Sequence, residues 1–362
     1  MTEPVTVPGR TALLVLNYNA MRYIGDCIDG LQCQTCTNHE IIVIDNASTD
    51  GSAEYVATRY PHVRLLRQSE NLGVGAGFNA GIRLALAEGF AYIALFNPDI
   101  RLDPAWLAET MATFERQPQA QICASMSLEA DGKHVDSAGG AILNLQSGIF
   151  GGYMGGVGVE DLPPDLRKLD FPVFFGLLTA MLVRREAFER CGLLAEDFFM
   201  YFEDIDFSWR VLLAGGEIWC NPNATLRHVG HGTTKTRAIE LRILTKTEGN
   251  LLATYWRNMS IGTLVWVLPC LVVTRLAGAG LYVVVSPRIA WGKFRAVLLA
   301  LAAALGGRHR RARAQAQALR MRRDVDVLRV NPLPLRAFAM PLRFCRGWLR
   351  GVGAAYRKAG SA

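Results

Sequence analysis

The chain has 362 residues, of which 51% are hydrophobic and 20% are charged, and its formal net charge is +7. That charge is unevenly distributed, because residues 308–362 carry +12 and residues 1–307 carry −5. The basic balance therefore belongs to a tail and argues against a nucleic-acid-binding body, so no nucleic-acid partner is expected. A chain of this length can bury a sizeable core in one large domain or two smaller ones.

Neither the N-terminus nor the cysteines indicate export. Residues 1–10 lack the basic and then apolar pattern of a signal peptide, so we expect the N-terminal region to stay in the cytosol. The eight cysteines show no regular spacing, which agrees with a reducing compartment. Cys27, Cys33, Cys36 and His39 could be drawn as a zinc site, but two clean ligand pairs are missing, and free thiols are the stronger expectation.

Short apolar runs separated by helix-length spacers dominate the first hundred residues. They are Ala12–Leu16, Ile41–Ile44, Val63–Leu66 and Tyr92–Phe96. Such runs are typical of buried parallel strands in an α/β sheet. Polar clusters follow the first, second and fourth runs, beginning at Asn17, Asp45 and Asn97. Because ligands bind at the carboxyl ends of parallel strands, we expect these clusters to face one pocket.

A glycine-rich segment lies between the third and fourth runs. Gly73, Gly75 and Gly77 do not form a dinucleotide-binding fingerprint, because they do not follow the first strand and the spacing is not G-x-G-x-x-G. They would still let the backbone approach a nucleotide, with a helix over Phe78–Leu86 behind them. A loop that only needs left-handed residues explains the glycines equally well.

The middle of the chain is less regular. Gly132–Leu169 is rich in glycine and weakly patterned, which predicts an irregular insert that could move over a site. The apolar residues 171–185 predict a buried strand containing Gly176. A short helix, Arg185–Arg190, should end at Gly192 as its C-cap.

The stretch F-E-D-I-D-F-S-W-R, Phe202–Arg210, places Glu203, Asp204 and Asp206 within four positions. Acids are favoured at helix N-termini, so Asp204 could be a helix cap and Asp206 a helix-start acid. Alternatively, one of them is a general base, because a carboxylate among other carboxylates and apolar rings has a raised proton affinity.

A further strand is expected over Glu217–Cys220, and L-R-H-V-G-H-G-T-T follows it. His228 and His231 are two of only six histidines. A lone histidine is usually structural, whereas a pair in a polar turn behind a sheet favours a functional role.

In chain order, the motifs L-N-Y-N, I-D-N-A-S-T-D-G, N-L-G-V-G-A-G-F-N-A-G, N-P-D, F-E-D-I-D-F-S-W-R and H-V-G-H-G-T-T resemble those of glycosyltransferase family 2. The likeness is to its rhamnosyltransferase-like branch, which builds bacterial surface polysaccharides, and it covers about residues 11 to 235. It implies a GT-A fold, which is a Rossmann-like, mixed, mostly parallel sheet flanked by helices. It also implies a nucleotide-sugar donor, a divalent metal (Mg²⁺ or Mn²⁺) and inversion at the anomeric carbon.

The resemblance also implies roles for individual residues. Asp204 looks like the catalytic base, with Glu203 shaping its surroundings. Asp45 looks like the acid that accepts from the pyrimidine base. The donor site as a whole would comprise Asn17, Tyr18, Asn19, Asp45, Asn71, Gly73, Gly75, Asn79 and Asn97.

For the metal, Asp99 of N-P-D resembles the ligand of the family's D-x-D motif. Asn97 occupies the first acid position, so only one carboxylate of that motif remains. His228 aligns best with the histidine that completes metal or diphosphate binding, and His231 is the second choice.

The composition changes beyond residue 235. Met259–Thr274 is uncharged and apolar, Arg275 interrupts it, and Leu276–Ser286 continues it. A single span would place Arg275 near mid-bilayer at about 2.5–3.5 kcal/mol, and Pro269 and Gly278 should break the helix. We therefore expect helices that lie in or dip into the cytoplasmic leaflet, with a true span second and a buried helix pair as the non-membrane alternative.

The tail supports membrane contact. Within Leu335–Arg350, apolar residues and arginines occupy separate helical faces, and Trp348 suits the membrane interface. A helix packed on the catalytic domain would show the same pattern. The chain is thus predicted to combine a GT-A catalytic domain, residues 1–235, with a helical membrane-associating region, residues 236–362, on the cytoplasmic face of the membrane.

The leading hypothesis is a metal-dependent, inverting glycosyltransferase that extends a lipid-linked saccharide from a dTDP- or UDP-type donor, with rhamnose as a candidate sugar. A polyprenyl-phosphate glycosyl synthase is an alternative, and its phosphate acceptor needs no strong base. A catalytically silent scaffold of a polysaccharide-assembly complex is another, because N-P-D lacks one acid.

Overall fold

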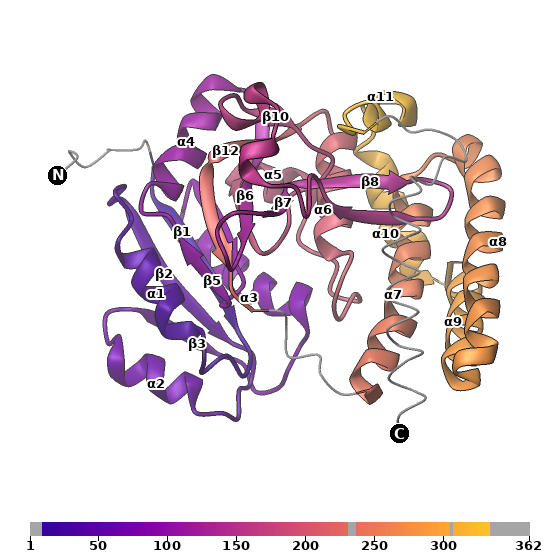
Figure 1. The fold of residues 1–362 in the computed structure, drawn as a ribbon, viewed down its shortest axis with the longest axis horizontal. Helices are drawn as coiled ribbons and strands as arrows, with labels where there is room; N and C mark the ends of the chain where they lie inside the picture. Colours follow the sequence, from indigo (N-terminus) through magenta and orange to yellow (C-terminus); the bar gives the residue numbers. More distant parts are fainter. Residues whose placement is uncertain (1–8, 231–236, 305–306, 334–362) are drawn as a thin grey trace.

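The computed structural model describes residues 9–230, 237–304 and 307–333, with helices on both faces of a central sheet (Figure 1). The strands are β1 (Thr11–Asn17), β2 (His39–Asp45), β3 (Arg64–Arg67), β4 (Tyr92–Phe96), β5 (Ile100–Leu102), β6 (Ala120–Glu129), β7 (Val135–Ala138), β8 (Gly140–Asn144), β9 (Ile149–Gly152), β10 (Phe171–Pro172), β11 (Ala180–Arg184) and β12 (Glu217–His228). The helices are α1 (Ile24–Gln32), α2 (Ser52–Arg59), α3 (Val74–Ala87), α4 (Trp106–Arg116), α5 (Arg185–Cys191), α6 (Glu203–Leu213), α7 (Arg237–Asn258), α8 (Ile261–Val285), α9 (Pro287–Ala304), α10 (Gly307–Ala318) and α11 (Asp324–Leu328).

The main sheet has the strand order β10-β12-β6-β11-β4-β1-β2-β3, with β5 paired to β12 and β7 to β6. Strands β3, β2, β1 and β4 are parallel, as are β6 and β12. Strand β11 runs antiparallel between β4 and β6. This arrangement confirms the predicted mixed, mostly parallel sheet.

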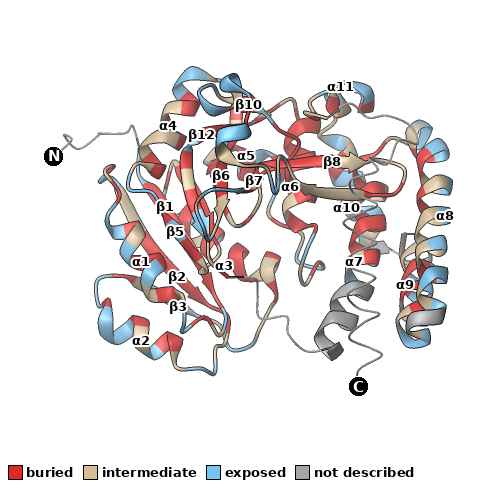
Figure 2. Ribbon diagram, in the orientation of Figure 1, coloured by how far each residue is buried: buried red, intermediate tan, exposed pale blue. Residues whose placement is uncertain are grey.

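Strand β1 is buried along its whole length, because both faces of the sheet are covered. Leu14 and Leu16 join the core on the α3 side, whereas Leu13 and Val15 join the core on the α1 and α4 side. Figure 2 shows the resulting buried layer through the central strands. The four strands predicted in this part of the chain are confirmed as β1 to β4.

The prediction of one strand over residues 171–185 is wrong. Two short strands, β10 and β11, flank a buried connection that contains Gly176. A Cβ atom at Gly176 would lie 2.9 Å from the Met181 sulfur and 3.0 Å from a methyl group of Ile122. The connection is apolar because it is packed in the core, and periodicity alone cannot distinguish that from a strand.

The insert Gly132–Leu169 is also more regular than predicted. It contributes β7 to the main sheet and forms a separate two-stranded sheet from β8 and β9. The Phe150 ring contacts Phe202, Trp209 and Tyr255, with ring centroids 5.7, 6.4 and 5.9 Å away. The insert is thus anchored by an aromatic cluster that it shares with α6 and α7.

Two expected helix boundaries can be compared directly. Helix α5 ends at Gly192, whose φ of 77° confirms the predicted glycine C-cap. Helix α3 begins at Val74, four residues before the predicted start at Phe78. The prediction was too short because the glycines at 75 and 77 are part of the helix; a Cβ atom at Gly77 would lie 2.7 Å from Leu16.

The C-terminal helices pack against one another and against the catalytic part. Helix α7 places Leu251 and Tyr255 in the same core as α3 and α6. Helix α8 is continuous past Pro269 and Gly278, so the predicted breaks are wrong. Helix α8 packs against α9, and such tertiary packing can hold a helix together through residues that disfavour it. The predicted amphipathic segment Leu335–Arg350 lies outside the described residues.

Candidate active site

The carboxyl ends of β1 and β2 meet at one register pair, Asn17 and Asp45. The Asn17 side-chain nitrogen donates to Asp45 Oδ1 at 2.9 Å, to Ser48 Oγ at 3.1 Å and to Ser52 Oγ at 2.9 Å. Asn17 is fully buried and Asp45 nearly so. The amide of Asn17 therefore shapes the loop after β2 and orients Asp45.

The other residues of the N-Y-N motif differ in exposure. Asn19 has a left-handed backbone with φ of 51°, and its Oδ1 accepts the Thr49 amide at 2.7 Å. Tyr18 is 41% exposed, so its ring is accessible to a ligand. A direct contact between the motif and a nucleotide remains a prediction.

The glycine-rich segment approaches another part of the protein. Asn71 Oδ1 accepts the Gly73 amide at 2.9 Å, and Gly73 has φ of 81°. A Cβ atom at Gly73 would lie 2.3 Å from the Phe199 carbonyl oxygen, and one at Gly75 would lie 2.6 Å from that of Ala195. The glycines therefore let the N-terminus of α3 pack against the loop that leads into α6.

Asn79 reinforces the same contact. Its buried amide exchanges hydrogen bonds with the backbone of Leu194, at 2.9 Å from Nδ2 and 3.0 Å to Oδ1, and Nδ2 also donates to Glu196 at 3.1 Å. These bonds tie α3 to the segment after α5. Its predicted role in binding the donor stays a prediction.

Helix α6 begins with the acidic pair, and the backbone before it is strained. Tyr201 and Phe202 have φ values of 68° and 76°, in a region that costs about 1–3 kcal/mol for a residue with a side chain. Phe202 is the N-cap, and Glu203 and Asp204 occupy the first turn. The alternative of Asp204 as the helix cap is therefore wrong, because the left-handed turn moves the cap two residues earlier.

The two acids of the pair lie in different surroundings. Glu203 is buried, its Oε2 has no hydrogen-bond partner in the described chain, and burial together with the neighbouring Asp204 charge raises its pKa well above the usual value. Burial also raises the pKa of Asp204 to about 6, although the backbone amides of Ile205 and Leu178 act in the opposite direction. At neutral pH, Asp204 is therefore mostly ionised, while burial shifts Glu203 toward its neutral form.

One short segment of backbone connects the acidic pair to the N-P-D motif. The Asp204 carboxylate is hydrogen-bonded to the backbone of Leu178, and the carbonyl of the next residue, Thr179, accepts the Asn97 amide at 3.2 Å. Two motifs that are more than 100 positions apart in the chain thus contact the same backbone segment, which leads directly into β11. This connection supports a common site for a base and a metal ligand.

Asp99 of N-P-D, His228 at the end of β12 and Asp136 form a carboxylate–imidazole–carboxylate array. His228 is the central residue of the three. Its Nε2 is 3.3 Å from Asp99 Oδ2, and its Nδ1 is 3.3 Å from Asp136 Oδ2. Burial lowers the pKa of His228, but the flanking carboxylates of Asp136 and Asp99 outweigh it and raise the pKa to about 9. Asp99 and His228 are adjacent oxygen and nitrogen donors that fit a divalent cation, with Asp136 orienting the ring from behind.

Sequence reasoning missed Asp136. It lies on β7 within the insert that was predicted to be irregular, and Ser127 Oγ donates to its Oδ2 at 2.9 Å. No motif marks it, because its proximity to His228 arises only from the pairing of β7 with β6 and of β6 with β12. The other candidate ligand, His231, lies outside the described residues.

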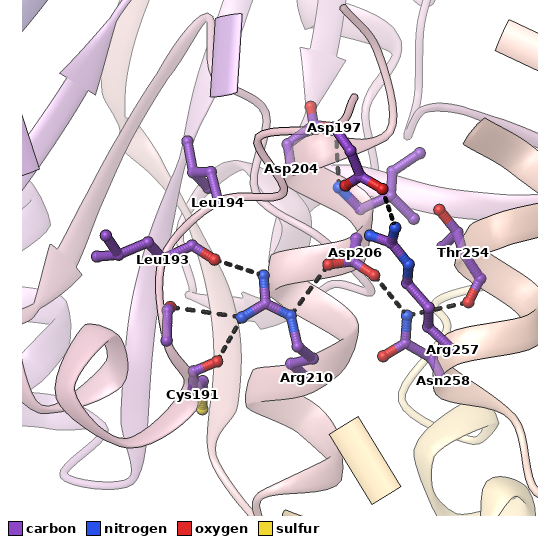
Figure 3. A network of polar contacts seen from close by, with 12 residues as sticks. Cys191, Leu193, Leu194, Asp197, Asp204, Asp206, Arg210, Thr254, Arg257 and Asn258 are labelled. Carbon is purple, nitrogen blue, oxygen red and sulfur yellow. Dashed lines mark hydrogen bonds and ion pairs between the residues drawn. The ribbon is translucent and has the colours of Figure 1, made fainter. Parts of the chain in front are cut away.

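Asp206 lies in the first turn of α6, as expected for a helix-start acid, and it is also part of a buried network (Figure 3). Its Oδ2 is 3.0 Å from Arg210 Nε, and its Oδ1 accepts from Asn258 of α7 at 2.9 Å. Arg210 also donates to the Leu193 carbonyl at 2.8 Å. The arginine four residues later was the available signal, since that spacing places both side chains on one helix face.

A second group of acidic residues and the thiols of the described residues are not part of the carboxylate–imidazole–carboxylate array. Glu129, Asp131 and His134 gather on an exposed turn, where Asp131 Oδ1 accepts the Lys133 amide at 2.8 Å and so stabilises the turn. The described cysteines are free thiols, as expected.

Comparison with known proteins gives the family. The sequence model of glycosyl transferase family 2 matches residues 13–192. The chain is 31% identical over 223 residues to the N-acetylglucosaminyl-diphospho-decaprenol L-rhamnosyltransferase of Mycobacterium tuberculosis, an alignment that covers 56% of this chain and 70% of the relative.

Two solved structures share the fold at low sequence identity. Residues 1–349 of S. aureus TarS superpose with a TM-score of 0.54 at 13% identity, covering 88% of this chain and 89% of that one. The mannosyltransferase of Pyrobaculum calidifontis, solved with GDP-Man and Mn²⁺, gives 0.50 at 15% identity, covering 90% and 87%. With the acidic pair and the sheet described above, these matches show that the chain belongs to glycosyl transferase family 2 and is a glycosyltransferase with a GT-A fold.

Proposed function

We propose that this glycosyltransferase is metal-dependent and inverting, and that it transfers rhamnose from a dTDP-type donor to a hydroxyl of a lipid-linked saccharide in surface polysaccharide synthesis. The main support is the acidic pair, in which burial raises the pKa of Asp204 to about 6. A base with such a pKa is mostly ionised at pH 7 and still basic enough to accept a hydroxyl proton as the bond forms. The sugar and acceptor follow the name of the mycobacterial relative.

The proposed reaction is a single displacement. Asp204 takes the proton of the acceptor hydroxyl while the acceptor oxygen bonds to the anomeric carbon, and the bond from that carbon to the diphosphate oxygen breaks. Burial and the neighbouring Asp204 charge raise the pKa of Glu203, which favours its neutral form beside the base. A single strong base candidate among the described residues is consistent with inversion.

A divalent ion is proposed to be held by Asp99 and His228. When bound, it would neutralise charge on the leaving diphosphate. The Asp136 carboxylate, 3.3 Å from His228 Nδ1, keeps the other ring nitrogen directed toward Asp99. Asn97 supplies no charge, so the protein provides a weaker site than a full D-x-D motif would. We propose Mn²⁺ or Mg²⁺ as the ion.

Membrane association is part of the proposal. Among the described helices, one stretch, Ile261–Val283, is long and apolar enough to cross a membrane. Only 22% of its most apolar 18-residue segment is buried in the protein. Arg275 within it pairs with Glu248 of α7 at 3.6 Å, so its charge is met by protein. Trp266 of α8 and Trp291 of α9 are 80% and 64% exposed. We propose that α8 and α9 rest on the cytoplasmic leaflet.

A donor panel tests this function. The full chain is incubated with dTDP-rhamnose and other nucleotide sugars and with a lipid-linked N-acetylglucosamine acceptor, in Mn²⁺, Mg²⁺ or chelator. We expect transfer from dTDP-rhamnose that chelation abolishes and that Asp204→Asn reduces about 10²- to 10⁴-fold.

Other results of the panel would favour the alternatives. Full activity of Asp204→Asn with a polyprenyl phosphate acceptor would favour a glycosyl-phosphate synthase, which needs no strong base. The absence of turnover with every donor would support a scaffold.

A further inference from the structure

A cavity of about 540 Å³ lies between α7 and α9. Its walls include Asn250 of α7, and Asp197 and Phe198 of the loop before α6. The Asn250 side chain donates to the carbonyls of Met200 at 3.0 Å and Tyr201 at 2.9 Å. Tyr201 is two residues before the acidic pair, so the cavity is separated from the catalytic acids by a single loop.

The cavity is lined by several basic side chains. Lys246, Arg288 and Arg295 line it, and none has a carboxylate partner in the described chain. The neighbouring cation Lys293, in contrast, is paired with Glu248. The one carboxylate of the wall, Asp197, is paired with Arg257. These cations favour the binding of an anionic ligand. Guanidinium groups in particular can donate paired hydrogen bonds to the oxygens of a phosphate.

The rest of the lining is apolar and continuous with an exposed surface. On α9, Arg288, Trp291, Arg295 and Leu299 recur at spacings of three and four, so they share one helical face. Trp291 and Leu299 line the cavity and are nevertheless 64% and 56% exposed. A ligand that satisfies this surface has an anionic head group and a long apolar tail.

We infer that the α7–α9 cavity binds the diphosphate and the first isoprenoid units of a polyprenyl-diphosphate-linked acceptor. The inference rests on the proposed function, because it names the site for the lipid end of that acceptor. The saccharide would then extend past the Asp197–Tyr201 segment toward Asp204, while the remaining isoprenoid chain follows the exposed side of α9 into the membrane.

Two kinds of variant test the cavity, each with a matched control. Arg288→Gln/Arg295→Gln removes the charge, and Arg310→Gln/Arg311→Gln removes equal charge from the exposed face of α10, outside the cavity. Gly249→Leu fills the cavity, because a Cβ atom there meets nothing within 4 Å, and leucine favours the helix. Gly280→Leu adds the same side chain at an open position of α8 outside the cavity.

Binding is measured on the full chain in uncharged detergent, with farnesyl diphosphate as the probe and chelator present, so that no metal-bridged diphosphate forms at Asp99. We expect both cavity variants to bind at least about tenfold more weakly than wild type, and both controls to bind within about twofold of it. In the transfer assay, the KM for the lipid-linked acceptor should rise while the KM for the nucleotide sugar stays unchanged.

Several results would overturn the inference. They are unchanged probe binding in both cavity variants, equal loss in the α10 control, equally tight binding of inorganic diphosphate, or equal competition by phosphatidylglycerol vesicles. The last two would identify a site for free phosphate or for ordinary lipid head groups. If wild type transfers no sugar but the cavity variants still bind farnesyl diphosphate more weakly than wild type does, the proposed function fails and the cavity assignment stands.

Discussion

Glu203 and Asp204 are consecutive in the chain, yet their surroundings differ, and Asp204 is the one that we propose as the base. Glu203 is buried with an unpartnered oxygen, so the protein favours its neutral form. Asp204 is half-buried, and its Oδ1 accepts the Ile205 amide at 2.8 Å, which partly offsets the cost of its charge. The strained turn at Tyr201 and Phe202 comes directly before the pair, and Glu203 and Asp204 open α6 behind it.

The Asp204 pKa of about 6 predicts a pH profile. The base must be deprotonated, so kcat/KM should fall about tenfold per pH unit below pH 6 and level off above it. Glu203→Gln replaces a neutral carboxyl by a neutral amide, so the acidic limb should stay near pH 6 with activity within about tenfold of wild type. Initial rates from pH 5 to 8 at saturating metal measure both. A limb displaced to lower pH in Glu203→Gln would show that Glu203 is ionised.

Asp136 provides a second prediction at this scale. If it orients His228 for a metal, Asp136→Asn should weaken Mn²⁺ binding about 10- to 100-fold, because a neutral amide holds the ring less firmly and makes it a poorer donor. Asp165→Asn is the matched control, since Asp165 is an exposed carboxylate of the insert between β9 and β10. Calorimetric titration of the metal separates the two variants. Equal affinity in Asp136→Asn and wild type would remove Asp136 from the metal site.

At the scale of elements, the catalytic helix is connected to the C-terminal helices by polar side chains. Asn258 of α7 donates both to Asp206 of α6 at 2.9 Å and to the Thr254 carbonyl at 3.0 Å (Figure 3). Arg257, one residue earlier, pairs with Asp197 in the loop before α6. Helix α7 therefore contacts both the first turn of α6 and the loop that precedes α6.

This connection predicts that Asn258→Ala impairs both stability and turnover. Losing a hydrogen bond to a buried carboxylate should lower the free energy of unfolding by roughly 2 kcal/mol. Because small displacements of a base are costly, kcat should fall about tenfold or more with the donor KM unchanged. Thermal unfolding and initial rates measure the two effects. Arg323→Ala, which removes an exposed ion pair with Asp326, should change neither appreciably. A destabilised but fully active Asn258→Ala would limit α7 to a structural role.

At the scale of the whole molecule, predictions from sequence succeeded where local pattern decides the structure. The strands β1, β2 and β4 each contain a continuous apolar run, and Gly192 ends α5 because a left-handed residue is needed there. Predictions failed where long-range packing decides. The buried connection around Gly176 was mistaken for a strand, and Asp136 was missed because its proximity to His228 depends on β7 pairing with β6.

The division into a catalytic domain, residues 1–235, and a membrane-associating region, residues 236–362, remains a prediction. Leu251 and Tyr255 of α7 share a core with Phe207 and Trp209 of α6. The first helix after that boundary therefore belongs physically to the catalytic part. Helices α8 and α9 carry most of the large exposed apolar side chains of the described residues, and they are the part of the described region best suited to contact lipid.

If α8 contacts the membrane, a substitution on its exposed face should reduce membrane binding without reducing the rate of sugar transfer. Trp266 and Val273 lie seven residues apart on α8 and are 80% and 65% exposed, so they share one face. Burying such a side chain contributes about 1.5–3 kcal/mol, so Trp266→Ser/Val273→Ser should weaken binding to anionic vesicles by at least about tenfold. Neither residue lines the α7–α9 cavity, so the rate with a short-chain, water-soluble acceptor should be unchanged.

Vesicle co-sedimentation and rates with the two acceptor types test this prediction together. The control is Leu169→Ser, which removes a 61% exposed leucine from the catalytic part, and it should bind vesicles like wild type. Equal sedimentation of Trp266→Ser/Val273→Ser and wild type would show that α8 does not rest on the bilayer. Loss of activity with the soluble acceptor would show that α8 supports catalysis directly. The prediction requires that Trp266→Ser/Val273→Ser binds vesicles more weakly and transfers sugar to the soluble acceptor at the wild-type rate.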